Sequence, residues 1–168
     1  MNRRPLLAAP ILALALPLLG LGSPAFAANL HRIVTLASIV EKETRLPEER
    51  PLVASVYTNR LARKIALDAD PTVIYAHRLA GDYSGALHHD DLAIDSPYNT
   101  YRFAGLPPGP IGAPGREALR AALHPAETDF LYFVASGNGP SRFAKSLEEH
   151  NRNVNLFRRT LRLTKGNG

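Results

Sequence analysis

Hydrophobic residues recur at intervals of three and four in three long stretches of the chain, and this spacing predicts three helices. The first covers 30–44. The second begins at Pro47, a residue suited to a first helical turn, and continues through Arg60; the third covers about 147–163. The apolar positions that mark the three buried faces are Ile33, Leu36, Ala37 and Val40, then Leu52, Val53, Val56 and Leu61, then Leu147, Val154, Phe157 and Leu161. The first two helices are expected to pack together as an αα-hairpin.

Shorter elements fill the rest of the chain. Asp70 before Pro71 resembles a helix N-cap and predicts a short helix over 71–78, and a further helix is expected over 116–123. The apolar run 130–135 predicts a strand that pairs with 141–144 across a glycine turn at 137–139. Many prolines and glycines between 95 and 115 predict a long, packed loop. The expected fold is therefore α+β, a mostly helical single domain with a small β-hairpin.

The first 27 residues have the pattern of a secretory signal peptide. Two arginines follow Asn2, an apolar stretch covers 6–21, and Ala25-Phe26-Ala27 is a small-residue cleavage site. The alternative is a retained anchor, because the chain carries no charge between Pro5 and Leu30. The prolines within this segment favour cleavage after Ala27, which leaves a domain over 28–168.

The amino-acid composition limits the classes of protein to which the chain can belong. The chain has 168 residues, of which 45% are hydrophobic and 21% charged, as in an ordinary globular domain, and it has no cysteine. Its net charge of +5 is concentrated near the C-terminus, where residues 142–168 hold seven basic and two acidic side chains. No stacking aromatics or groove-reading motif accompany these charges, so no nucleic-acid partner is expected. They indicate a solvated helix face or attraction to an anionic envelope polymer or lipid headgroups.

Glu41 and Glu43 end the first predicted helix, where desolvation beside an apolar face can make a carboxyl group a general acid. Solvated charges at a helix end are the alternative. In a helix the two residues lie on opposite flanks, roughly 160° apart, so they cannot both point into one small site. Periodicity alone does not choose between them.

Two other chemistries find little support. His77, His88, His89, Asp90 and Asp91 are metal-ligand types, but their spacing does not direct them to one point, so no metal and no cofactor is expected. A serine nucleophile at position 38, 96 or 136 would lack the G-x-S-x-G turn.

A series of motifs spans residues 36–151: LASIVEKET, RLPEERPLVASVYTNRL, DPTVIYA, DLAIDSPYNTYRFAGLPPGPIGAPG, AALHPA, DFLYFVASGNG and LEEHN. In these motifs the chain resembles the catalytic domain of the endolytic murein transglycosylase family (MltG, YceG-like). The resemblance implies a periplasmic enzyme with a lysozyme-like active site, or an inner-membrane one if the N-terminal segment is retained. Such an enzyme cleaves the MurNAc-β-1,4-GlcNAc bond inside peptidoglycan strands without water and leaves 1,6-anhydro-MurNAc ends.

The same resemblance implies a set of site residues. Its catalytic general acid and base falls on Glu41, and no second carboxylate is required. Substrate contacts are implied at Asp70, Thr72, Tyr98, Asn99, Thr100 and Tyr101, with helix capping as the alternative role of Asp70 and Thr72. The implied partner is the peptidoglycan glycan strand, and the involvement of a peptidoglycan synthase stays open.

The chain departs from the family pattern in several places. We expect no LysM-like domain ahead of the motifs. Asp68 occupies a position where the family often has glutamine, and Ser136 and Ser141 replace an aspartate and a histidine of the hairpin. Two rival functions therefore remain, a non-catalytic peptidoglycan-binding remnant and a muramidase that uses water.

Overall fold

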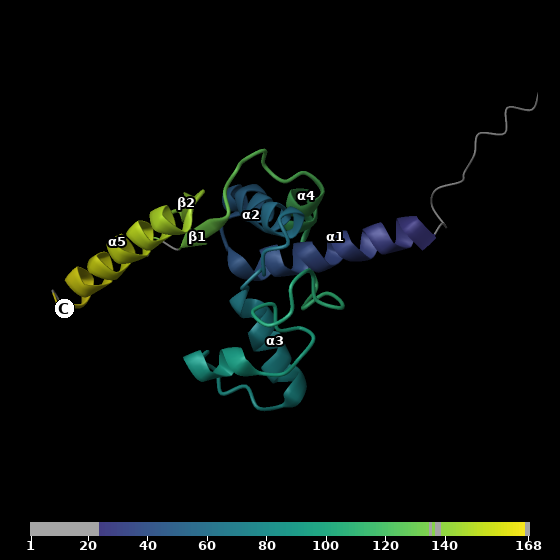
Figure 1. Cartoon of the computed structure of the whole chain (residues 1–168), viewed down its shortest axis with the longest axis horizontal. Coiled ribbons are helices and arrows are strands. Elements are labelled where there is room, and N and C mark those ends of the chain that lie inside the picture. Colours follow the sequence, from purple (N-terminus) through teal and green to yellow (C-terminus); the bar gives the residue numbers. More distant parts are fainter. Residues whose placement is uncertain (1–23, 135, 137–138, 167–168) are drawn as a thin grey trace, which may run out of the picture.

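The computed structural model describes residues 24–134, 136 and 139–166 (Figure 1), and of the side chains in these ranges those of residue 26 and 163–166 are left aside. All but the last four residues of the predicted signal segment therefore lie outside the described residues. Helix α1 (Pro24–Glu43) begins with the last four residues of that segment. Within the described ranges, no helix is both long and apolar enough to cross a membrane.

The core is a bundle of α1, α2 (Arg50–Ala62) and α4 (Arg116–Leu123), in which each helix packs against the other two. The two helices expected over 30–44 and 47–60 are confirmed, although Pro47–Glu49 forms a separate 3-10 turn, η1, before α2. Several alanines at the contacts let the helix axes approach closely. The buried core side chains of the bundle are Leu36, Ala37, Ile39, Val40, Val53, Ala54, Tyr57, Ala118 and Ala121.

Helix α3 (Asp70–Ala80) and the 3-10 helix η2 (His89–Ala93) form a second layer beside the C-terminal end of α1 (Figure 1). The helix begins at Asp70, one residue earlier than expected, with Ala69 as its N-cap. It ends at Gly81, whose φ of 81° is the left-handed conformation that glycine adopts without strain. The predicted role of Asp70 as an N-cap is therefore wrong.

The proline- and glycine-rich loop between η2 and α4 is packed, as the sequence predicts. Ile111 and Asn99 are buried in it. The main-chain N–H of Ile111 donates a hydrogen bond of 3.0 Å to Oγ of Ser38 on α1. This contact fixes the loop onto the central helix.

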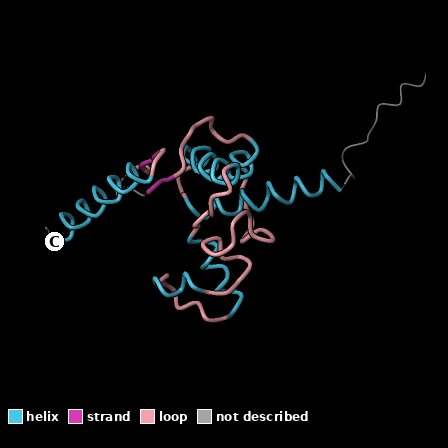
Figure 2. The backbone as a smooth tube through the Cα atoms, viewed as in Figure 1, coloured by secondary structure: helices cyan, strands magenta, loops and turns pink. Residues whose placement is uncertain are grey.

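The predicted hairpin is confirmed in a shorter form. Strands β1 (Tyr132–Val134) and β2 (Arg142–Ala144) are antiparallel, with Phe133 opposite Phe143. Helix α5 (Leu147–Gly166) follows, packs its first turns against this hairpin and then extends away from the body (Figures 1 and 2). Leu161, on the extending part, is 40% exposed, and Leu147 at the start of the helix is 56% exposed, although the apolar pattern predicts burial of both. The α+β, mostly helical fold is confirmed.

Candidate active-site cleft

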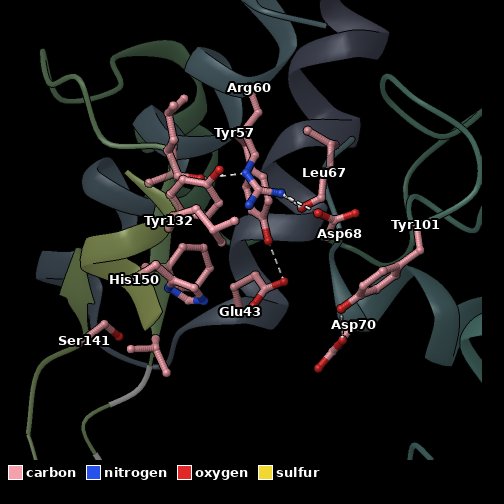
Figure 3. Close-up of a pocket in the computed structure, with 15 residues that line it drawn as sticks. Glu43, Tyr57, Arg60, Leu67, Asp68, Asp70, Tyr101, Tyr132, Ser141 and His150 are labelled. Carbon is pink, nitrogen blue, oxygen red and sulfur yellow. Dashed lines mark hydrogen bonds and ion pairs between the residues drawn. The ribbon is translucent and has the colours of Figure 1, made fainter. Parts of the chain in front are cut away.

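A cleft of about 510 Å³ lies where the last turn of α1, the middle of α2, the start of α3, the hairpin and α5 meet (Figure 3). Its lining mixes apolar side chains with several ionisable ones, as binding sites for small polar groups do. The polar and aromatic residues that line it are Glu43, Tyr57, Arg60, Asp68, Asp70, Tyr101, Tyr132, Phe133, Ser141 and His150.

Glu43, the last residue of α1, carries the carboxyl group at the centre of this cleft (Figure 3). Its Oε1 atom accepts a hydrogen bond of 2.6 Å from the hydroxyl group of Tyr57, and the described residues supply no hydrogen bond to its Oε2 atom. Burial raises the pKa of Glu43 from 4.5 to about 7; the Tyr57 hydrogen bond lowers this pKa, and the charge of Asp70 raises it. A carboxyl group with such a pKa exchanges protons near neutral pH.

Glu41 lies on the opposite flank of α1 and does not line the cleft. Its Oε1 atom is 2.9 Å from Nη2 of Arg50 at the start of α2. Its Oε2 atom accepts a hydrogen bond of 3.0 Å from the main-chain N–H of Gly115, the N-cap of α4. Glu41 thus links three helices. The structure brings Glu43 and not Glu41 into the cleft. The catalytic role that the family resemblance implies for Glu41 stays a prediction.

Asp70 and Tyr101 form the wall of the cleft opposite the hairpin (Figure 3). The Tyr101 hydroxyl donates a hydrogen bond of 2.5 Å to Oδ1 of Asp70. Burial and the hydrogen bond to Asp70 raise the pKa of Tyr101 well above its usual value, so its phenol remains protonated. Both residues were predicted to lie at the site, and both line the cleft.

Arg60 on α2 joins three segments beneath the cleft. Its Nε atom donates to the carbonyl oxygen of Leu131 at 2.7 Å, and its Nη1 atom donates to the carbonyl oxygen of Leu67 at 3.0 Å. The same Nη1 atom lies 2.9 Å from Oδ2 of Asp68. The guanidinium carbon is 5.0 Å from the centre of the Tyr132 ring, within the range of a cation–π contact. One buried side chain therefore holds the strand β1 against α2 and the start of α3.

The hairpin and α5 complete the cleft. His150 stacks on Tyr132 with a distance of 5.3 Å between ring centres. Burial, followed by the charge of Arg60, lowers the pKa of His150, which keeps its imidazole neutral at pH 7. Just before β2, the main-chain N–H and the hydroxyl of Ser141 both donate to the carboxylate of Glu49 in η1. These contacts fix the hairpin relative to α1 and α2.

Four of the residues predicted to contact substrate do not line the cleft and form contacts inside the protein. Thr72 and Thr100 are buried, with 2.9 Å between their hydroxyl oxygens. Asn99 is also buried; its amide nitrogen donates to the carbonyl oxygens of residues 92 and 94, and its amide oxygen accepts from the N–H of residue 101. Tyr98 packs against Tyr75 and does not line the cleft. These side chains shape the loop that carries Tyr101, and the substrate contacts implied for them stay a prediction.

His77, the first histidine of the candidate metal ligands, forms local contacts with the residues that follow it. Nδ1 of His77 lies 2.8 Å from Oδ1 of Asp82, and Nε2 of His77 lies 3.1 Å from the carbonyl oxygen of Asp91. Within the part of the chain that the structure describes, no three histidine or carboxylate side chains are grouped as metal ligands.

Sequence comparison decides the family. The profile of the YceG-like family matches residues 23–156, which is most of the chain. The chain belongs to the YceG-like family. A protein of Bacillus subtilis named endolytic murein transglycosylase is 48% identical over 124 residues, which cover 74% of this chain and 34% of that protein. A protein of the same name from Streptococcus pneumoniae is 39% identical over 130 residues, covering 75% of this chain and 23% of that protein.

A solved structure supports the same assignment. The crystal structure of a YceG-like protein from Listeria monocytogenes superposes with a TM-score of 0.66 at 46% sequence identity, covering 73% of this chain and 38% of that one. This YceG-like chain spans only about a quarter to a third of the length of the curated relatives that it matches. The family resemblance of its motifs is confirmed.

Sequence reasoning assigned no role to Tyr57, Arg60, Tyr132 or His150, which all line the cleft. Each stands in one of the motifs shared with the YceG-like family, in VASVYTNRL, DFLYFVASGNG or LEEHN. The motifs mark these residues, but only the fold brings them together around Glu43.

Proposed function

We propose that this YceG-like domain is the catalytic domain of a peptidoglycan lytic transglycosylase. It cleaves the MurNAc-β-1,4-GlcNAc bond within glycan strands and leaves 1,6-anhydro-MurNAc ends. The names of the two relatives support the activity. The observation that carries the proposal is the carboxyl group of Glu43, which faces the cleft with a pKa raised to about 7 and with Oε2 available to substrate.

In this mechanism Glu43 acts first as an acid and then as a base. The protonated carboxyl group donates its proton to the oxygen that links MurNAc C1 to GlcNAc, and the C1–O bond breaks as GlcNAc departs with a hydroxyl group. The C6 hydroxyl of the same MurNAc then attacks C1, and the carboxylate of Glu43 accepts the proton of that hydroxyl. The nucleophile belongs to the substrate, so its high effective concentration replaces water. The enzyme regains its proton in each cycle.

The wall of Asp70 and Tyr101 contributes positioning and charge. The hydroxyl of Tyr101 engages one oxygen of Asp70, which leaves the other oxygen to face the cleft. A fixed negative charge there stabilises the positive charge that develops at C1 in the transition state. The ring of Tyr101 offers an apolar surface on which a sugar can stack.

Product analysis tests the proposed function. The purified full chain is incubated with sacculi, and soluble muropeptides are identified by mass spectrometry. We expect 1,6-anhydro-MurNAc ends. Reducing ends would mean a muramidase that uses water, a reaction for which Asp70 provides a second carboxylate in the same cleft. Binding to sacculi without new ends would mean a non-catalytic remnant.

We also propose that residues 1–27 direct export, so that the domain acts in the periplasm on the strands exposed there. The positive start, apolar stretch and Ala25-Phe26-Ala27 site of this segment support the assignment. N-terminal sequencing of the protein recovered from the periplasm gives Ala28 as the first residue if the segment is cleaved as expected.

Tyr57→Phe should shift the pH dependence of the reaction upward. The hydrogen bond from Tyr57 lowers the pKa of Glu43, so its loss raises that pKa further. Because kcat/KM requires the protonated acid, its alkaline limb, expected near pH 7, moves by about one unit to higher pH. The measurement is a kcat/KM profile from pH 5 to 9.

Tyr98→Phe is the matched control for that experiment, since it removes a tyrosine hydroxyl that does not line the cleft. Its profile should coincide with that of the unmodified chain. An unchanged profile in Tyr57→Phe would show that Glu43 is not the group whose protonation limits the rate.

A further inference from the structure

A second, smaller pocket lies beside the catalytic cleft, at the junction of α1 and α3. Its volume is about 170 Å³, and it is lined by Lys42, Pro71, Ile74, Tyr75, Arg78, Tyr83 and Ile111. Residues that are adjacent in sequence line different sites. Glu43 and Asp70 line the cleft, whereas Lys42, next to Glu43, and Pro71, next to Asp70, line this pocket. The first turn of α3 therefore separates two sites that are adjacent along the chain.

The walls of this pocket are held in place by packing. Ile111 is buried, and its main-chain N–H is fixed to Ser38 on α1. The ring of Tyr75 is held by that of Tyr98, with 4.8 Å between the ring centres. The pocket thus presents a preformed apolar surface, which lowers the entropy lost on binding.

Two cationic side chains, those of Lys42 and Arg78, lie beside that apolar surface. Lys42 and Arg78 are exposed, and no carboxylate is among the residues that line the pocket. Neither cation forms an ion pair with any residue that the structure describes. The guanidinium carbon of Arg78 lies 5.1 Å from the centre of the Tyr83 ring, which holds the group by its face and leaves its N–H edges to a ligand. This arrangement is complementary to a carboxylate attached to an aliphatic group.

We propose that this pocket binds a peptidoglycan stem peptide, taking one of its carboxylates at Lys42 and Arg78 and an alanine side chain on the apolar floor. The inference rests on the proposed function, because it requires the sugar of the same strand in the cleft. A volume of about 170 Å³ is well below the roughly 300–1,000 Å³ of pockets for drug-sized ligands, and suits one or two small residues. A stem of four or five extended residues reaches about 15 Å, enough to cross a helix of roughly 10 Å diameter.

The binding experiment titrates the full chain with an N-acetylated stem pentapeptide by calorimetry. We expect Arg78→Gln and Lys42→Gln each to weaken binding about tenfold. Arg120→Gln, which removes an exposed arginine on α4, is the matched control and should bind as the unmodified chain does. Unchanged binding in both pocket variants overturns the proposal, and so does acetate that binds as tightly as the peptide, since the site would then hold a simple anion.

A kinetic comparison separates stem recognition from catalysis. Glycan strands with their stems, and the same strands stripped by an amidase, are given to the unmodified chain and to Arg78→Gln. The variant should raise KM about tenfold for the intact strands, with kcat unchanged and with no effect on the stripped strands. Equal effects on both substrates would overturn the proposal. If the unmodified chain cleaves neither substrate, the proposed function fails, whereas the peptide titration still decides the pocket.

Discussion

Replacing Glu43 with glutamine should lower the rate of anhydro-muropeptide formation roughly a thousandfold, the scale of a lost general acid and base. Glutamine has the same shape as glutamic acid but cannot release or accept the transferred proton. Its amide oxygen can still accept the hydrogen bond from Tyr57, so the fold around the cleft is retained. Initial rates of product release from sacculi, followed by mass spectrometry, give the measurement.

Glu41→Gln is the matched control, two residues away on the same helix. It removes a partly buried ion pair with Arg50, whose side chain is 12% exposed, and leaves an acceptor for the N–H of Gly115. The expected result is a loss of about 1 kcal/mol in the free energy of unfolding, with activity within a few-fold of the unmodified chain. An inactive Glu41→Gln beside an active Glu43→Gln would return the catalytic role to Glu41.

Stability provides a second measurement on Glu43→Gln. The pKa of Glu43 is about 7 in the folded chain, against 4.5 without the fold, so folding favours the protonated form. That stabilisation is fully present below pH 4.5 and is lost as the pH rises through 7, at a cost of up to about 3 kcal/mol. Glutamine does not titrate, so urea unfolding should show a weaker loss of stability between pH 5 and 8 in the variant. An equal loss would mean that Glu43 is not the titrating group.

The position of the acid illustrates what an amphipathic pattern determines. Spacing along α1 predicts which face is buried and places Glu41 and Glu43 on opposite flanks, and both expectations agree with the structure. The choice between the flanks depends on what each one meets. Arg50 and the start of α4 approach one flank, and Tyr57 of α2 approaches the other. Those neighbours belong to other helices, so the pattern of hydrophobic residues along α1 does not predict them.

The segment from Tyr98 to Tyr101 is divided by the fold for a related reason, because Tyr101 lines the cleft and its three neighbours do not. Tyrosine and asparagine side chains suit a sugar-binding site, but the same groups also satisfy the backbone of a tight loop. Asn99 has no exposed surface, and its amide group forms hydrogen bonds with the backbone of that loop, whereas Tyr101 lines the cleft. Composition identified the right segment, and only packing separates its structural members from the one at the site.

Arg60 is the residue that the sequence pattern describes least well. An arginine near the end of an amphipathic helix is normally solvated, yet this one is only 8% exposed. Its hydrogen-bond partners come from the turn before α3 and from Leu131, the residue before strand β1, which is about seventy residues away in the chain. The sequence of α2 alone therefore predicts neither contact.

Arg60→Met should therefore produce the largest loss of stability, about 3–5 kcal/mol in the free energy of unfolding. Methionine keeps much of the length of the side chain but donates no hydrogen bond. The carbonyl oxygens of Leu67 and Leu131 lose their charged donor, and Tyr132 loses the cation beneath its ring. Urea unfolding at pH 7, followed by circular dichroism, measures the difference.

Two further variants keep this expectation decisive if Arg60→Met fails to fold. Arg60→Lys retains the charge but cannot reach both segments with its single nitrogen, so an intermediate loss of about 2 kcal/mol is expected. Arg63→Met removes an exposed arginine three residues along the chain and should change stability by less than about 0.5 kcal/mol. A loss in Arg60→Lys no larger than that in Arg63→Met would contradict the role of Arg60, because the buried hydrogen bonds would then contribute nothing that a solvated side chain lacks.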